Sequence, residues 1–504
     1  MSHLPVLPIL LPFFAGVAIA LLGRGRPPVA RGLGELATVG GLIVAILLLN
    51  AASAGETLVY ALGDWPVPYG IALTVDRLSA LMVLLTAVLA LAAEVYARAR
   101  PLRSTVTFQA LFQFQLMGLN GAFLTGDLFN LFVFFEVLLI ASYGLLVIEG
   151  GAQRVRAGLH YVLVNLAGSS LFLIALGIVY GTAGTLNLAD LIHKVPLLPA
   201  DRQPLIAAAG LLLLVVFGLK AALAPLYLWL PATYAAAPAP VAALFAVMTK
   251  VGAYALLRVH AVLFAPGSLP YGGLVQYWLL AAALVSLILG SVGVLASPTL
   301  PRLVAYLVVV SLGTMMVSVA IGSPEAVAAS LYYMVHSTLV TAALFLLADL
   351  VATQRGPRGD QLEPGERVHQ PTVIGGLFLL LATSVAGLPP FSGFFGKLMI
   401  IQASAPSSVA VLAWTLILAS SLVVVVALSR AGSRLFWKTT DSARPALPAA
   451  PILLLPVLAL ASASALLVLF GGAAQQFATA AAEQLLDRSA YVQGVLGELA
   501  EERP

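Results

Sequence analysis

The sequence has 504 residues, of which 61% are hydrophobic and 9% are charged, and its net charge at pH 7 is +4. About a quarter of the residues of an average soluble domain are charged, so this composition excludes a water-soluble globular protein and indicates a surface that mostly contacts lipid. The small net charge gives no indication of nucleic-acid binding. The absence of cysteine excludes disulfides, thiolate metal sites and iron–sulfur clusters.

A helix of about 20 apolar residues crosses the hydrocarbon core of a bilayer. By this measure the chain is an all-α integral membrane protein with about 14 transmembrane helices, formed as a single polytopic domain over 1–504. The N-terminal run lacks a basic region and a clear cleavage site, so it is expected to remain as the first span. A polar segment, 475–504, is expected to form a surface helix or tail. In chain order the predicted spans are 4–22, 34–52, 75–97, 107–125, 128–148, 159–181, 205–230, 239–262, 274–296, 302–321, 326–351, 372–404, 408–430 and 451–470.

Two of these spans are too long for one crossing and contain proline in the middle. Pro225 lies within 205–230, and Pro389 and Pro390 lie within 372–404. Proline inside a helix removes a backbone donor and clashes with the preceding turn, so both helices are expected to be broken. Broken helices are tolerated at membrane depth where they line a cavity or are shielded by protein.

The two broken helices are the seventh and twelfth predicted spans, and this odd offset gives them opposite orientations in the membrane. Opposite orientations are typical of transporters that are built from inverted repeats. The sequence therefore predicts a first inverted repeat over 107–262 and a second over 274–430.

Basic residues gather in the loops that follow odd-numbered spans, whereas the opposite loops carry acidic residues and few lysines or arginines. Cytoplasmic loops of membrane proteins carry an excess of lysine and arginine. The basic side is therefore predicted to be cytoplasmic, and both termini are expected to lie outside the cell inner (cytoplasmic) membrane. The basic loops include Arg24, Arg98, Arg154, Arg302, Arg355 and Arg430, and the acidic loops include Asp64, Asp127, Asp190 and Glu325.

Three lysines stand alone inside apolar spans. Lys220 and Lys250 are the only charged residues between 204 and 257, and Lys397 is the only one between 368 and 429. An ionised side chain at the centre of the bilayer costs about 2.5–3.5 kcal/mol on insertion scales, so such residues are functional by default. Burial disfavours the charged form of a lysine and brings it into the range where it exchanges protons. The alternative is a structural lysine that binds helix-end carbonyls at the breaks.

An acid and a histidine accompany these lysines. Glu136 lies about 12 Å into the span 128–148 at 1.5 Å per residue and is the natural counter-ion for Lys220. His336 lies in the span 326–351, and an ordinary histidine pKa of about 6.5 suits a proton relay. The charge of each site alters the proton affinity of the next. The alternatives are a structural ion pair and a hydrogen-bonded core histidine. Residues near span ends are expected to be interfacial or to support the relay from outside it: His160, Arg258 and His260.

Three stretches resemble a known family: "TGDLFNLFVFFEVLLIASYGLLV", "GLKAALAPLYLWLPATYAAAPAPVAALFAVMTKVGAYALLRV" and "AGLPPFSGFFGKLMII". They are similar to the antiporter-like subunits shared by respiratory complex I and Mrp-type multisubunit Na+/H+ antiporters, over roughly 70–430 of the chain. The Phe-rich "GDLFNLFVFFE", the lysine-free "HSTLVTAALFLLADL" and the chain length most resemble Mrp D subunits.

The resemblance implies two inverted repeats of about five helices each and a central hydrophilic axis. It implies that Glu136 and Lys220 form the family's Glu–Lys pair and that Lys250 connects the two halves. It also implies that His336 is the relay residue of the eleventh helix and that Lys397 is the last residue of the relay. Many relatives have a lysine a few residues after this histidine, where the present sequence has Thr341.

The resemblance implies the ion-translocating subunit of a monovalent cation (Na+)/proton antiporter: a secondary transporter and not an enzyme, without cofactors or a metal site. Its expected partners are other hydrophobic subunits, protons, monovalent cations and the lipid bilayer. One alternative is a proton-pumping subunit of a complex I-type NADH:quinone oxidoreductase, powered by redox chemistry elsewhere. Another is a non-transporting assembly scaffold, whose buried charges fix helix register. No dense carboxylate site marks a path for Na+.

Overall fold

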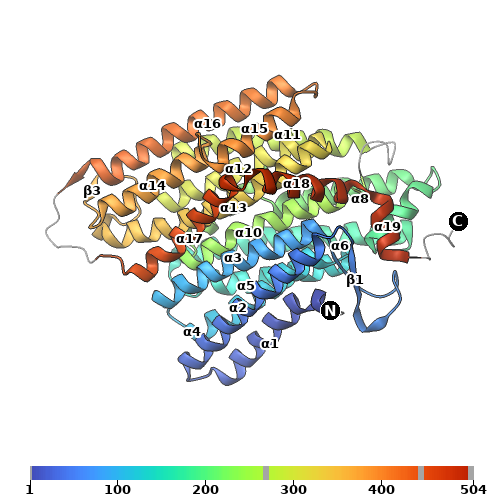
Figure 1. Cartoon of the computed structure of the whole chain (residues 1–504), viewed down its shortest axis with the longest axis horizontal. Helices are drawn as coiled ribbons and strands as arrows, with labels where there is room; N and C mark the ends of the chain where they lie inside the picture. Colours follow the sequence, from blue (N-terminus) through green and yellow to red (C-terminus); the bar gives the residue numbers. More distant parts are fainter. Residues whose placement is uncertain (1–2, 101, 261, 265–271, 441–447, 498–504) are drawn as a thin grey trace.

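The computed structural model describes residues 3–100, 102–260, 262–264, 272–440 and 448–497. These residues form an elongated bundle of helices (Figure 1), with the N-terminal helices along one side and α14–α16 along the other. The first half contains α1 (Leu7–Leu22), α2 (Pro27–Ala52), α3 (Arg77–Ala99), α4 (Thr105–Leu124), α5 (Leu128–Val147), α6 (Ala152–Ala183), α7 (Leu188–Lys194), α8 (Gln203–Lys220), α9 (Trp229–Ala236) and α10 (Ala239–Ala255). The second half contains α11 (Gly272–Ala296), α12 (Leu300–Ile321), α13 (Pro324–Gln354), α14 (Pro371–Ala386), α15 (Ser392–Ser404), α16 (Ala410–Gly432), α17 (Pro451–Leu469), α18 (Gly471–Leu486) and α19 (Arg488–Leu496).

In the described residues, 12 helices are long and apolar enough to cross a membrane. The prediction of an all-α integral membrane protein is confirmed, but the count of fourteen is not. The predicted span 107–125 corresponds to α4, whose hydropathy is lowered by its amide side chains. The predicted span 372–404 is divided into α14 and α15, each shorter than a full crossing. The amides of α4 are Gln109, Gln113, Gln115 and Asn120.

The two proline-containing spans are interrupted at their prolines. Helix α8 ends at Lys220, Ala222 has a left-handed backbone with φ of +57°, and Pro225 lies in the non-helical connection to α9. Pro389 and Pro390 lie in the connection between α14 and α15. Each break leaves helix-end carbonyls without an intrahelical partner. Polar side chains in the interior of the bundle can donate hydrogen bonds to these carbonyls.

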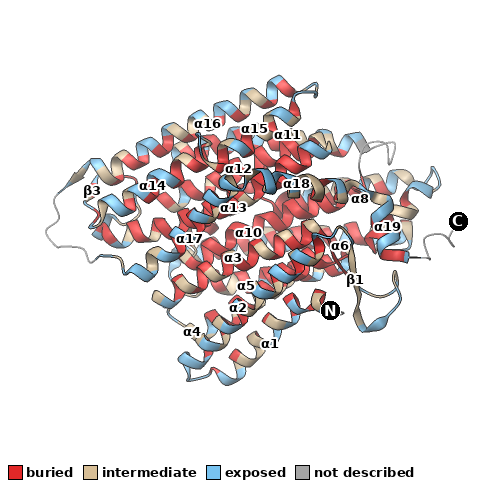
Figure 2. Cartoon of the chain, in the orientation of Figure 1, coloured by how far each residue is buried: buried red, intermediate tan, exposed pale blue. Residues whose placement is uncertain are grey.

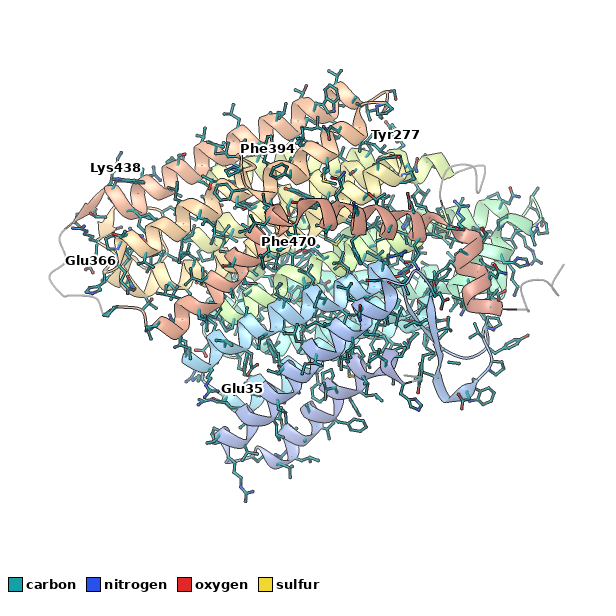
Figure 3. The ribbon with its side chains drawn as sticks, in the orientation of Figure 1. Glu35, Tyr277, Glu366, Phe394, Lys438 and Phe470 are labelled. Atoms are coloured by element: carbon teal, nitrogen blue, oxygen red, sulfur yellow. The ribbon has the colours of Figure 1, made fainter. Side chains whose placement is uncertain are left out.

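The loops meet at two opposite ends of the bundle. At one end, β1 (Leu58–Ala61) pairs antiparallel with β2 (Ala72–Val75), and Asp127 pairs with Asn187. At the other end, β3 (Gly365–Glu366) pairs parallel with β4 (Thr439–Thr440), and Thr299 pairs with Gln361. Figure 3 shows Glu366 and Lys438 at this second end, where the basic loops lie. Several of the predicted basic loops meet at this end, since Arg154 and Arg302 line one cleft and Arg434 donates to the Leu362 carbonyl.

Burial is greatest along the axis of the bundle. Figure 2 shows that α10 and α13 are mostly buried, and all residues from 240 to 260 are buried. Large apolar side chains on the outer helices are exposed, as expected of surfaces that contact lipid. The helices that carry Lys250 and His336 are thus central ones. Examples of exposed side chains are Leu36, Ile43, Leu412 and Leu422.

The C-terminal segment folds as two helices that dock on the bundle. Helix α18 packs against α13 and α3, and α19 packs against α7. Gln484 in α18 donates a hydrogen bond to the Gly55 carbonyl at 2.9 Å and accepts one from the Arg77 backbone amide at 3.1 Å. The segment predicted as a polar tail is therefore held to the loop before α3. Its last part, 498–504, lies outside the described residues.

Candidate functional site

Lys220 reaches Glu136 through a serine. Lys220 is the last residue of α8 and is buried. Its ammonium donates to the Ser169 hydroxyl at 3.1 Å and to the Asn165 carbonyl at 3.4 Å, both on α6. The Ser169 hydroxyl in turn donates a short hydrogen bond to a Glu136 carboxylate oxygen on α5. Among the described residues the predicted pair is thus bridged and not in direct contact.

This bridge is a complete hydrogen-bonded path for a proton. A serine hydroxyl donates one hydrogen bond and accepts others, so Ser169 accepts from the ammonium and donates to the carboxylate. A proton passing from Lys220 to Ser169 can accompany one passing from Ser169 to Glu136. Sequence reasoning missed Ser169, because an uncharged residue in an apolar span gives no charge signal. The only signal is its spacing of four from Asn165, which places both on one face of α6.

Lys250 lies in the most buried helix and has no partner within the part of the chain that the structure describes. Its ammonium nitrogen has no hydrogen-bond partner among the described residues, and neither has the neighbouring Thr249 hydroxyl. Helix α10 packs directly on the end of α8, since a Cβ added at Gly252 would lie 2.3 Å from the Ala221 backbone nitrogen. A buried ammonium without an acceptor does not stabilise a fold. A purely structural role for Lys250 therefore has no contact to support it.

His336 lies at the second helix break. Its Nδ1 shares a 2.8 Å hydrogen bond with the hydroxyl of Ser392, the first residue of α15. The Ser392 hydroxyl shares a 2.7 Å hydrogen bond with Ser464 on α17. The other ring nitrogen, Nε2, has no partner in the described part of the chain and faces Gly393. One nitrogen is therefore held by a serine pair, and the other is free to exchange a proton.

Lys397 binds the end of the helix before the break. It donates to the Ala386 carbonyl at 2.9 Å and to the Ser421 hydroxyl at 2.8 Å. Helix-end carbonyls carry partial negative charge. This contact is therefore the one expected of a structural lysine that binds helix-end carbonyls at a break. Gly387 has φ of +83°, and a Cβ there would lie 2.9 Å from Lys397 Cδ. The break therefore needs glycine at this position.

The five predicted relay residues fall into three places. Glu136 and Lys220 meet at the first break, His336 and Lys397 lie at the second, and Lys250 lies on α10, which contacts both α8 and α13. Lys250 and Lys397 are both close enough to His336 to interact with it electrostatically. Within the described residues, no direct hydrogen bond joins Lys250 to the groups at the first break or to those at the second.

A cleft lies at the basic end, beside α6, α9 and α12. It has a volume of about 1150 Å³ and is lined by Arg154, Arg302 and Asp360 among others. A smaller cavity of about 140 Å³ shares Arg154 and Asp360 with it and reaches Tyr234. The Tyr234 hydroxyl donates to the Phe245 carbonyl on α10 at 2.7 Å. Polar groups thus extend from this end of the bundle toward the helix that holds Lys250.

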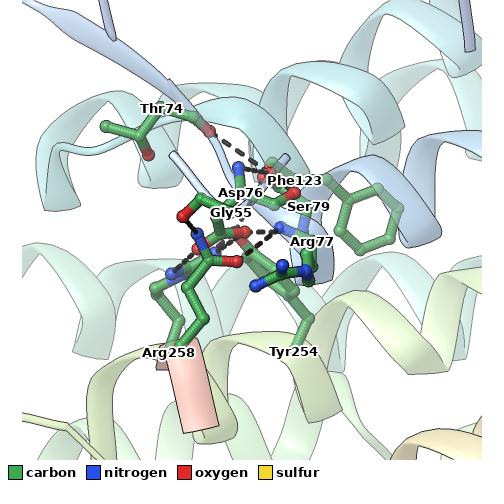
Figure 4. Close-up of polar contacts among 9 residues, drawn as sticks. Gly55, Thr74, Asp76, Arg77, Ser79, Phe123, Tyr254 and Arg258 are labelled. Atoms are coloured by element: carbon green, nitrogen blue, oxygen red, sulfur yellow. Dashed lines mark hydrogen bonds and ion pairs between the residues drawn. The ribbon is translucent and has the colours of Figure 1, made fainter. Parts of the chain in front are cut away.

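Arg258 and His260, which were expected to be interfacial or to support the relay from outside it, are buried, so they are not interfacial. Helix α10 continues as a π-helical turn over Leu256–His260, which carries both residues under the loop before α3. Arg258 forms two hydrogen bonds to Asp76, at 2.5 and 2.9 Å, and donates from Nε to the Tyr254 hydroxyl at 3.1 Å (Figure 4). Asp76 also caps α3, and this N-cap position was the available sequence signal.

Comparison with known proteins identifies the relatives of the chain. The family model described as "NADH:quinone oxidoreductase/Mrp antiporter, TM" matches residues 125–425, which include all five predicted relay residues. The chain is 40% identical to the D subunit of a probable K(+)/H(+) antiporter of Rhizobium meliloti (strain 1021), over 98% of each chain. It is 34% identical to the D subunit of a Na(+)/H(+) antiporter of Bacillus subtilis (strain 168), over 99% of this chain and 100% of that one.

A solved structure supports the same relationship over the whole fold. The chain is similar to one in the structure of the Mrp complex from Dietzia sp. DQ12-45-1b, with a TM-score of 0.88 and 26% identity. The match covers 98% of this chain and 99% of that chain.

Proposed function

Because the chain belongs to the NADH:quinone oxidoreductase/Mrp antiporter transmembrane family, we propose that it is the ion-translocating subunit of a multisubunit monovalent cation/proton antiporter. The observation that carries this proposal is the bridged Lys220–Ser169–Glu136 path in the interior of the bundle. Ionisable residues inside transmembrane segments are rare, pair with one another and mark ion pathways and proton relays. The cation is Na+ or K+, the two that appear in the names of these relatives.

The proposed proton path uses the five buried groups in turn. A proton moves between Glu136 and Lys220 through Ser169, then to Lys250 on α10, to His336 on α13 and to Lys397. Buried waters supply the steps to Lys250 and His336, since Lys250 Nζ and His336 Nε2 lack a protein partner among the described residues. Each transfer changes the charge beside the next site and so changes its proton affinity.

The proposed architecture places these groups in two inverted repeats, 107–262 and 274–430. Each repeat contributes one helix that is broken at proline, α8–α9 in the first and α14–α15 in the second, and each break holds a buried lysine. The gathering of the basic loops at one end supports a cytoplasmic position for that end. Both termini then lie outside the cell inner membrane, and the lipid-facing outer helices contact partner subunits or lipid.

A second candidate is a proton-pumping subunit of a complex I-type NADH:quinone oxidoreductase. The family description covers both kinds of complex, and the same buried groups serve either. The two complexes differ in the energy source for proton movement. This source is a cation gradient in the antiporter and redox chemistry in other subunits of the oxidoreductase. Purification of the native complex separates them. Flavin and iron–sulfur subunits in the complex favour the redox pump, and only small hydrophobic subunits favour the antiporter.

The proposed function is tested in everted membrane vesicles that contain the chain with or without its partner subunits. A pH gradient is imposed, and its collapse is followed after addition of Na+, K+ or choline chloride. The proposal expects Na+ or K+ to move protons in vesicles with the full set of subunits, and choline to have no effect. Equal responses to choline and to both alkali cations would overturn it.

Replacing Ser169 with alanine is expected to slow cation-driven proton movement about tenfold, equivalent to about 1.4 kcal/mol in the barrier. The variant removes the hydroxyl that joins Lys220 to Glu136 and leaves both charged groups in place. Ser170→Ala is the matched control, because Ser170 is exposed and its hydroxyl bonds only to the Leu166 carbonyl. Equal rates for the two variants in the vesicle assay would exclude Ser169 from the path.

A further inference from the structure

A second buried polar region lies among α1–α4, apart from the proposed relay. Gln109, Gln113 and Asn120 lie along α4, over about 16 Å at 1.5 Å per residue. Gln113 donates to the Gly34 carbonyl at 3.1 Å and to the Thr38 hydroxyl at 3.0 Å, both on α2. Asn120 donates to a carbonyl of α1 at 2.9 Å. These amides give α4 a polar side inside an otherwise apolar group of helices.

The Glu94 carboxylate lies beside these amides and has no counter-ion among the described residues. Glu94 on α3 is only 1% exposed. The Gln109 amide donates a short hydrogen bond to one of its oxygens, and the other oxygen has no partner among the described residues. The nearest arginine along the helix, Arg98, is paired with Glu35 at 2.7 Å. Taking an ionised carboxylate out of water without a cation is very costly, so Glu94 is a group that needs a positive ligand or a proton.

Further oxygen atoms lie unpaired in the same region. The amide oxygens of Gln109 and Gln113 are buried and have no hydrogen-bond donor within the described chain. Gln109 Oε1 lies against α2 at Gly34, where an added Cβ would be 1.9 Å away. Carboxylate, amide and backbone carbonyl oxygens are the ligands that hard cations prefer. Carbonyl oxygens can also replace the hydration shell of a monovalent cation.

The region lies near one end of the bundle. Glu35 and Arg98 are partly exposed there, and Glu94 lies one helical turn farther in from Arg98. Figure 3 shows Glu35 on the side of the N-terminal helices, away from α14–α16. A cation that approaches this end would meet Glu35 before it reaches Glu94.

We propose that Glu94, with the amide oxygens of Gln109 and Gln113, binds a dehydrated alkali cation, Na+ or K+. This inference rests on the proposed function and assigns its cation to α2–α4, away from the proton relay. Helix α3 also joins this region to the centre: the Tyr96 hydroxyl donates to Asp349 on α13 at 2.6 Å. Helix α13 carries His336, so one pair of packed helices links the cation site to the relay.

Two measurements test the site, one on the purified complex and one in vesicles. The first is the melting temperature in NaCl, KCl or choline chloride at equal ionic strength. The wild type is expected to be stabilised by an alkali chloride more than by choline chloride, and Glu94→Gln is expected to lose this difference. The second is the cation concentration that half-saturates proton movement in vesicles, which Glu94→Gln is expected to raise at least about tenfold.

Control variants separate failure of the site from failure of the proposed function. Glu56→Gln changes an exposed acid in the loop before β1, away from the site, and should keep both wild-type values. Gln113→Leu removes one amide oxygen, keeps the carboxylate and should raise half-saturation in the same direction by a smaller factor. Lys220→Ala should stop proton movement but keep the alkali-specific stabilisation.

The site is overturned by equal stabilisation of the wild type in choline and alkali salts, or by wild-type behaviour of Glu94→Gln. A wild-type complex that moves no protons overturns the function and leaves the melting test of the site intact.

Discussion

Replacing Lys250 with methionine is expected to abolish cation-driven proton movement while leaving the protein as stable as the wild type or more so. Lys250 is fully buried, and its ammonium has no acceptor among the described residues. Replacing buried charged groups with apolar residues of similar volume is often neutral or stabilises by about 1–4 kcal/mol. Methionine keeps the length of the side chain and removes the proton. Vesicle transport and the melting temperature of the purified complex are measured on the same variant.

Lys438→Met is the matched control, because Lys438 is exposed at the basic end of the bundle. It should change neither transport nor stability. The assembly-scaffold alternative expects the reverse result for Lys250→Met: lower stability or lost assembly, with no specific transport defect. Normal transport in Lys250→Met would remove this residue from the relay.

Replacing Asp76 with asparagine is expected to destabilise the protein by about 3–5 kcal/mol, since it leaves a buried arginine without its partner. The two side chains are 3% and 4% exposed, and their hydrogen bonds join the start of α3 to the end of α10. Tyr491 on α19 also lies 5.7 Å from the guanidinium, so the C-terminal helices are expected to loosen. Denaturant unfolding in detergent measures the loss. Asp64→Asn, at an exposed position on the same end, is the control.

The same ion pair predicts a pH dependence. Burial alone would raise the pKa of Asp76, but the charge and hydrogen bonds of Arg258, with the hydrogen bonds from Ser79, hold the pKa below its usual range. The pair therefore stabilises the fold fully above the ordinary aspartate pKa of about 3.9, and this contribution is lost as the pH falls through the lower native pKa. The difference in melting temperature between the wild type and Asp76→Asn should stay constant from pH 7 to about pH 4. A difference that shrinks near neutral pH would contradict the assignment.

The helix breaks could be predicted because proline and isolated charge act locally. Pro225, Pro389 and Pro390 remove backbone donors wherever the chain folds, and a lone lysine is visible in any apolar run. The paths between these groups could not be predicted in the same way. Ser169 and Ser392 are uncharged and differ from other helix serines only in which helices they face.

Long-range contacts account for what the sequence left open. Arg258 was expected to be interfacial or to support the relay from outside it, because it lies near the end of a span. Its partner Asp76 is 182 residues away, so the burial of the pair could not be predicted. Glu94 was not singled out, because it lies close to the end of the predicted span 75–97. The amides that surround Glu94 lower the hydropathy of α4. In a sequence, lower hydropathy indicates a less apolar span and does not indicate a binding region. Packing of α2, α3 and α4 was needed to bring these groups together.

Proton relay through the bridged Lys220–Glu136 pair is tested most directly by cation-driven proton movement in everted vesicles that contain Lys220→Ala in the full complex. The variant removes the donor to Ser169 and should abolish the response to Na+ and K+ at every concentration, while the complex still assembles. A wild-type response in the assembled Lys220→Ala complex would contradict the relay.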